Sequence, residues 1–203
     1  MQSDPPFTAE KMTQLLKGEA GGFTLQFKAA AIVLILFEEL KSTIVGRTRS
    51  FFSDSFEVGA DGSIVDHPDA EYLASIKGKS EFRVCRDFHL KQSAMAQADD
   101  TFIDEFARLR NSVSHELVRM MLDDRIEMIR PEPIARALTL IGKIEGWWLF
   151  NFEAGIAPDE FEHLSEEQIK AGRSVNFILI NKLIERVFAD EPGLSEVTGH
   201  SER

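Results

Sequence analysis

The sequence predicts an all-α fold, and three observations support this prediction. Apolar residues recur every three or four positions over two long segments, 101–122 and 131–148, which is the spacing of one helix face. Prolines and capping residues stand where these segments begin. With 43% hydrophobic and 28% charged residues in a chain of 203, the composition is that of a globular domain able to bury a core without disulfides or metals.

The first part of the chain is predicted to hold a short helix, a long helix and a hairpin or loop. Residues 8–17 contain helix formers, and glycines at 18–22 break the pattern. The run that begins at Phe23 is too long for a strand, and its Ala, Glu, Leu and Lys residues favour one largely buried helix. Residues 53–69 contain an Asp61-Gly62 pair between short apolar segments, which is typical of a small hairpin or an exposed loop.

The rest of the chain is predicted to consist of helices joined by turns. Asp99-Asp100-Thr101 has the side chains of an N-cap, and Pro131 and Pro133 suit a first helical turn. The expected helices are 69–76, 81–95, 101–122 and 131–148, followed after Pro158 by a polar helix and then a mixed one.

These elements suggest three parts. Residues 1–22 form an N-terminal appendage helix, residues 23–152 a helical domain, and residues 153–203 an acidic helical extension with a disordered tail. From Asn151 onward the chain has eleven acidic and five basic residues, so over half of the net charge of −11 lies in the final quarter.

Composition and motifs exclude several classes of function. The chain lacks the glycine-rich nucleotide motifs, the HExxH zinc motif and the GxSxG hydrolase motif. Its single cysteine, Cys85, lies in no metal-binding cluster, and no two of its five histidines are four positions apart. We therefore expect neither a metal nor a cofactor. Because the chain is acidic overall, contact with nucleic acid would need a local basic patch.

The sequence also predicts a cytoplasmic protein without a membrane partner. The longest apolar run, Ala29–Phe37, is about half of the roughly 20 residues that a membrane span needs. Residues 1–6 contain Asp4 and two prolines, without the basic and apolar segments of a signal peptide.

One group of polar residues interrupts the apolar face of the predicted helix 101–122. The string LRNSVSHEL, residues 109–117, places Arg110 directly before Asn111 and five positions before His115. The next predicted helix begins with Pro131 and carries a Trp-Trp pair. This pattern resembles the RNxxxH form of the Rx4–6H motif of the HEPN superfamily, and the resemblance covers roughly residues 23–152.

The resemblance implies a HEPN-like four-helix bundle with additional N- and C-terminal helices. It implies a metal-independent endoribonuclease connected with toxin–antitoxin systems or phage defence, with RNA as substrate and a neutralising antitoxin or a nucleotidyltransferase as partner. It also implies a homodimer in which two motif helices face each other, so that two copies of Arg110 and His115 line one cleft. Helix geometry permits this arrangement, because Asn111 and His115 share a face while Arg110 lies about 140° from His115 around the axis.

The implied catalytic residues are Arg110, Asn111 and His115. His115 would remove the proton of the ribose 2′-hydroxyl or protonate the leaving 5′ oxygen, since imidazoles change charge near neutral pH. Arg110 would hold the scissile phosphate with its planar, charged guanidinium. Asn111 would orient the histidine or a phosphate, and Ser114 is a candidate for substrate contact nearby. The product would be a 2′,3′-cyclic phosphate, which DNA cannot form.

Two basic clusters are the candidate RNA-binding regions. One comprises Lys41, Arg47 and Arg49, and the other comprises Lys77, Lys79, Arg83, Arg86 and Lys91. The substrate-binding residues predicted from them are Arg47, Arg49, Arg83 and Arg86. Solvated helix faces explain the same charges equally well.

Two alternatives to the ribonuclease stay open at this stage. In the first, a HEPN-like module without catalysis binds a nucleotide or a protein partner, and the net acidity favours it because ribonucleases commonly attract RNA electrostatically. In the second, the motif is accidental, as the looser matches Arg83 to His89 and Arg108 to His115 illustrate. The function is then an unrelated interaction or a small-molecule pocket lined by Phe and Trp.

The accidental motif makes its own structural expectations. Arg110 would form a salt bridge within its helix, and His115 would be a partly buried histidine bonded to a carbonyl. The within-helix partners to consider are Asp104, Glu105 and Glu116. A solvent-accessible His115 keeps the enzyme hypothesis open, whereas a buried, isolated His115 excludes it.

Overall fold

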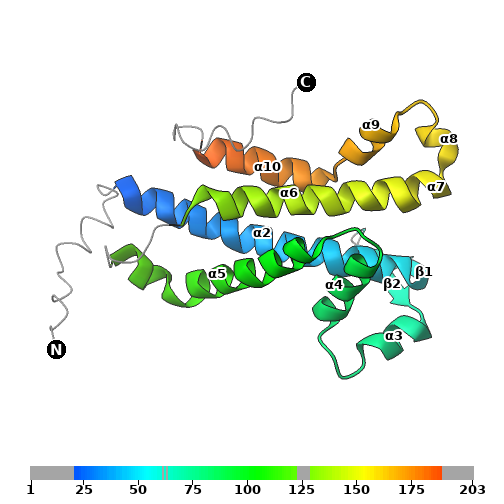
Figure 1. The fold of residues 1–203 in the computed structure, drawn as a ribbon, viewed down its shortest axis with the longest axis horizontal. Helices are drawn as coiled ribbons and strands as arrows, with labels where there is room; N and C mark the ends of the chain where they lie inside the picture. Colours follow the sequence, from blue (N-terminus) through cyan, green and yellow to red (C-terminus); the bar gives the residue numbers. More distant parts are fainter. Residues whose placement is uncertain (1–20, 61, 63, 123–128, 189–203) are drawn as a thin grey trace.

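The structure is a computed structural model that describes residues 21–60, 62, 64–122 and 129–188. It confirms a mostly helical protein, with a two-stranded sheet as its β-structure in these residues. Figure 1 shows four long helices lying side by side in the order α10, α6, α2 and α5, with α4 packed against one end of α2.

Helix α2, Gly21–Phe51, is the central helix of the fold. It contacts α4, α5, α6 and α10, and its inward residues Ile32, Val33, Leu36, Leu40 and Ile44 are all buried. The helix begins at Gly21, so the Gly21-Gly22 pair that was expected to break the chain is helical. Packing of a long apolar face outweighs the low helix propensity of two terminal glycines.

The predicted hairpin is confirmed. Strands β1, Ser53–Val58, and β2, Ile64–Pro68, pair antiparallel with Val58 opposite Ile64. Gly62 has a φ of 81°, a left-handed conformation that glycine adopts without steric penalty. The strands are largely exposed, and the hairpin projects beside α3 and α4 (Figure 1).

Helices α3, Ala70–Ile76, and α4, Glu81–Lys91, follow the hairpin. The Asp69 carboxylate caps α3 by accepting a hydrogen bond from the Tyr72 N–H at 2.7 Å. Helix α4 ends four residues before the predicted end at 95, and the chain turns through Ser93 at a φ of 59°.

Helix α5, Gln97–Leu122, carries the motif. It starts four residues earlier than the predicted Thr101, because Asp99 lies inside the first turn and not at the cap. Its carboxylate reaches back to accept a hydrogen bond from the Ala96 N–H at 2.8 Å, the role that an acidic N3 residue plays in a capping box. Phe102, Phe106 and Val113 on its inner face are buried.

The remaining helices complete the same core. Helix α6, Pro131–Trp148, begins at the predicted proline and continues as a π-helix, η1, Leu149–Glu153. Three short helices follow before the last long one: α7 Ala154–Ile156, α8 Pro158–Phe161, α9 Glu166–Ala171 and then α10 Val175–Phe188. Ile184 and Phe188 of α10 are buried in the core shared with α2 and α6, so the first part of the predicted extension packs into the bundle.

Two expectations lie outside the described residues. The N-terminal appendage helix falls almost wholly in 1–20, and the disordered tail falls in 189–203. None of the described helices combines the length and the apolarity that crossing a membrane requires.

Candidate functional site

Arg110 lies midway along α5 and is fixed against α2. Its Nη2 donates to Glu38 Oε1 at 3.1 Å, and its guanidinium lies 5.6 Å from the centre of the Phe37 ring. Its Nη1 also donates to Asn111 Oδ1 at 3.3 Å. The side chain is 33% exposed, and its Nε is buried without a hydrogen-bond partner among the described residues. The guanidinium is therefore oriented by the protein, and its buried Nε–H has no partner among the described residues.

The other three motif side chains are exposed to solvent. Asn111, Ser114 and His115 lie on the outer part of α5, and the Ser114 hydroxyl donates to the Arg110 carbonyl at 2.9 Å. His115 makes no hydrogen bond or ion pair with the part of the chain that the structure describes. Its imidazole is thus available to a substrate or a second protein, and the burial that would have excluded the enzyme hypothesis is not observed.

Arg110 and His115 point in different directions within one protomer. Arg110 turns toward α2, as its bond to Glu38 shows, while the exposed His115 lies about 140° further around α5. One copy of the chain therefore presents the two groups separately. Bringing both to one phosphate requires a second copy or a substrate that wraps around the helix.

Arg86 is built into the core and not into an open site. It is 5% exposed, and its Nε and Nη1 donate to Asp100 Oδ1 and Asp104 Oδ1, both at 2.6 Å. Its Nη2 donates to the Asp100 carbonyl at 2.8 Å. Burial alone would lower the pKa of Arg86, but these hydrogen bonds outweigh it and the pKa is raised. The side chain ties α4 to α5 and leaves little for RNA to contact.

The other three predicted substrate-binding arginines do not gather in one place. Arg83 is exposed on α4, within 3.3 Å of Asp87. Arg47 forms an ion pair with Glu153, the last residue of η1. Arg49 pairs with Glu81 of α4. Each cation already has a carboxylate partner, so the two sequence clusters do not form a continuous basic surface.

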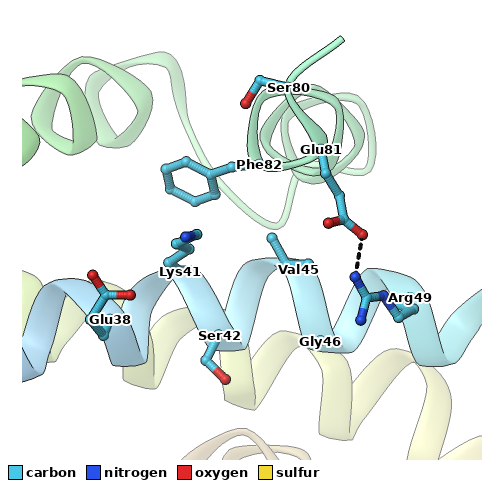
Figure 2. Close-up of a pocket in the computed structure, with 9 residues that line it drawn as sticks. All are labelled: Glu38, Lys41, Ser42, Val45, Gly46, Arg49, Ser80, Glu81 and Phe82. Carbon is cyan, nitrogen blue, oxygen red and sulfur yellow. Dashed lines mark hydrogen bonds and ion pairs between the residues drawn. The ribbon is translucent and has the colours of Figure 1, made fainter. Parts of the chain in front are cut away.

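Arg49 lies at the edge of a pocket between α2 and α4 (Figure 2). Its Nη2 is 2.6 Å from Glu81 Oε1, which also accepts from the Tyr72 hydroxyl at 2.8 Å. Burial favours the neutral form of Glu81, yet these two hydrogen bonds prevail and the pKa of Glu81 is lowered. Lys41 lines the same pocket, so this part of the first basic cluster does come together.

His89, part of a looser motif match, is a core residue. Its Nδ1 lies 2.8 Å from the Cys85 carbonyl, and its Nε2 accepts from Trp148 Nε1 at 2.9 Å. These partners fix the tautomer with the proton on Nδ1. Burial lowers the pKa of His89, so it is neutral and inaccessible. The Arg83-to-His89 match therefore carries no exposed chemistry.

Sequence reasoning missed Glu38 and Phe37, the two residues that orient Arg110. It considered only carboxylates of the same helix, whereas Glu38 is 72 positions away. The available signal was Glu38 itself, a charge directly after the apolar run that ends at Phe37. In the described residues, no three His, Cys, Asp or Glu side chains gather as metal ligands.

No protein family, no curated protein and no solved structure matches the chain in the three comparisons.

Proposed function

We propose that the protein is a dimeric, metal-independent endoribonuclease of the HEPN type. One observation carries the proposal: His115 and Asn111 are exposed on α5 next to an Arg110 that Glu38 and Phe37 hold in place. An accessible imidazole, an amide and an oriented guanidinium are the groups that metal-free cleavage of RNA requires. By the same resemblance, the biological setting is a cytoplasmic toxin or defence system with an antitoxin or nucleotidyltransferase partner.

The proposed reaction needs two histidines and a cation. One His115 takes the proton of the 2′-hydroxyl as its oxygen attacks the phosphorus. The bond from phosphorus to the 5′ oxygen breaks, and the second His115 of the dimer protonates that oxygen. Arg110 stabilises the charge that develops on the phosphate. The products are a 2′,3′-cyclic phosphate and a free 5′-hydroxyl.

One face of α2 is the proposed position of the second copy. Phe27 and Ile35 are 53% and 39% exposed, and with Glu38 they occupy one side of this helix at 3.6 residues per turn. Exposed apolar residues of this size favour protein contact. Because Glu38 holds Arg110, a copy that packs on this face would lie next to the motif and could bring its own His115 there.

A second candidate function is a binding module without catalysis. It is favoured by the net charge of −11 and by the carboxylate partner that each of Arg47, Arg49, Arg83 and Arg86 already has. Such a module would keep the dimer and bind a nucleotide or a protein.

Cleavage of RNA in EDTA distinguishes the two functions. We would compare the wild type with His115→Ala and Arg110→Ala, and with two matched controls that remove an exposed histidine and an exposed arginine elsewhere, His163→Ala and Arg186→Ala. General acid–base groups contribute about 100-fold or more to rate, so each motif variant is expected to lose at least that much. The controls keep wild-type activity.

The ends of the products provide an independent check. Cyclic-phosphate ends that appear with the wild type and vanish with both motif variants support the ribonuclease. A folded wild type that leaves RNA intact, or motif variants that cut as fast as the controls, would leave the binding module as the better account.

A further inference from the structure

The pocket between α2 and α4 is a second chemical feature beside the motif. It has a volume of about 560 Å³, within the range of roughly 300–1,000 Å³ that small-molecule sites occupy. Its walls are the part of α2 from Glu38 to Arg49 and the start of α4, Ser80–Phe82 (Figure 2).

One cation of this pocket forms no ion pair, although its charge helps to lower the pKa of Glu81. Glu38 is paired with Arg110 at 3.1 Å and Glu81 with Arg49 at 2.6 Å. Lys41 lines the pocket and makes no ion pair or hydrogen bond within the described chain. The lining holds two cations, Lys41 and Arg49, and two carboxylates, Glu38 and Glu81. Because Glu38 is bonded to Arg110 outside the lining and Glu81 to Arg49, Lys41 is the cation that is left without an ion pair. An anionic ligand is therefore the kind that this pocket attracts.

Neutral groups in the pocket add recognition elements. The hydroxyls of Ser42 and Ser80 have no partner among the described residues, and Ser80 precedes α4 without capping it. The Phe82 ring forms an apolar wall, with Phe37 at its edge at a centroid distance of 6.3 Å. A Cβ built on Gly46 would meet nothing within 4 Å, so the floor at Gly46 is open space.

We propose that this pocket binds the phosphate of a nucleotide. Lys41 supplies the charge, Ser80 donates a hydrogen bond to a phosphate oxygen, and the Phe82 ring contacts the nucleoside. A free nucleotide and one unit of an RNA strand present the same chemistry. If the strand is the source, the pocket is a substrate subsite and rests on the proposed function, because Glu38 links the pocket to Arg110.

Binding to two probes tests the proposal. AMP and a single-stranded 2′-O-methyl trinucleotide, which lacks the attacking hydroxyl, are titrated by calorimetry into the wild type, Lys41→Glu and Gly46→Met. The charge reversal and the added side chain are each expected to raise Kd at least about tenfold. Lys182→Glu, a charge reversal at an exposed lysine of α10, is the matched control and binds as the wild type does. Circular dichroism verifies that each variant is folded.

The outcomes separate the two possible sources and the two proposals. Binding of AMP identifies a free-nucleotide site, and binding of the trinucleotide alone identifies an RNA subsite. If neither probe binds the wild type, or if both pocket variants bind as tightly as Lys182→Glu, the pocket proposal is overturned even when RNA is cut. If the probes bind through Lys41 but RNA stays intact, the pocket stands and the ribonuclease fails.

Discussion

Arg86 shows how a residue that looks like a binding cation in the sequence is a structural one in the fold. Its guanidinium is enclosed by Asp100 and Asp104, and the Asp100 side chain is only 5% exposed. Removing one partner of a buried ion pair leaves the other charge without water or a counter-ion. The energetic role of Arg86 is therefore to keep Asp100 compensated.

We expect Arg86→Ala to lower the free energy of unfolding by about 3–5 kcal/mol, because the buried Asp100 keeps only the more distant Arg83, whose Nη1 lies 3.8 Å from Asp100 Oδ2. Arg83→Ala on the same helix removes a side chain that is 55% exposed and that is only a secondary partner of Asp100, at 3.8 Å, and its effect should be at most about 1 kcal/mol. Urea denaturation of both variants measures the difference. Equal, small losses would show that the Arg86 pair has no structural role.

His89 makes stability depend on pH in a defined direction. Burial lowers the pKa of His89 in the folded protein. Once the pH falls below the ordinary histidine range, His89 therefore binds a proton in the unfolded chain but not in the folded one. The neutral His89 therefore contributes fully to the free energy of unfolding above about pH 6.5. As the pH falls below this value, the contribution decreases by up to about 1.4 kcal/mol per pH unit. We expect His89→Gln, although less stable at pH 7, to lose less stability than the wild type between pH 7 and 5.5.

Denaturant midpoints at the two pH values test this expectation. His163→Ala removes an exposed histidine and should retain the wild-type loss on acidification. The same loss in His89→Gln would assign the acid sensitivity to other groups.

At the scale of elements, two helical glycines differ in what surrounds them. A Cβ on Gly146 of α6 would lie 2.2 Å from the Lys170 carbonyl oxygen of α9, whereas one on Gly46 of α2 would meet nothing within 4 Å. Gly146 therefore permits α9 to approach α6 closely. No neighbouring helix lies that close to Gly46.

We expect opposite effects from the same substitution at these two positions. Gly146→Ala should destabilise by about 1–3 kcal/mol, because the backbone of α9 must move. Gly46→Ala should stabilise by up to about 1 kcal/mol through higher helix propensity. Thermal unfolding gives both signs, and a stabilising Gly146→Ala would mean that α9 is not held against α6.

The elements that the sequence predicted well are those set by local pattern. Apolar spacing and prolines located α6, and the Asp61-Gly62 pair located the hairpin. The start of α5 was wrong by four residues because an acidic residue suits both the cap and the third helical position, and only the Ala96 hydrogen bond distinguishes them. Contacts between distant helices, such as Arg110 with Glu38, leave no local pattern.

The sequence predicted the candidate site only where a local pattern marks it. The motif identified an exposed polar group on α5, because its polar residues interrupt the apolar pattern of that helix. The basic clusters were not equally informative, because a count of lysines and arginines ignores their partners. Arg86 is three residues from Arg83 and Arg47 is two residues from Arg49 in the sequence, yet both face carboxylates in the fold.

At the scale of the whole molecule, the proposed dimer must overcome repulsion between two chains that each carry −11. Salt screens such repulsion over about 10 Å at 0.1 M, so the dimer fraction should rise with ionic strength.

We expect Ile35→Asp to favour the monomer, because it places a charge on the apolar face of α2 beside Arg110. Val175→Asp, at an exposed apolar residue of α10, should leave the dimer intact. Light scattering after size exclusion measures both.

A composite site also predicts complementation between inactive chains. In a mixture of Arg110→Ala and His115→Ala, the mixed dimer retains one Arg110 and one His115 on different chains. If the phosphate lies between the two copies, the mixture should cut RNA faster than either variant alone, although more slowly than the wild type because one histidine is missing. Adding Ile35→Asp to both chains should abolish this gain, since it acts only through association. A mixture no more active than its components would locate all the catalytic groups within one chain, which the opposite directions of Arg110 and His115 on α5 make difficult.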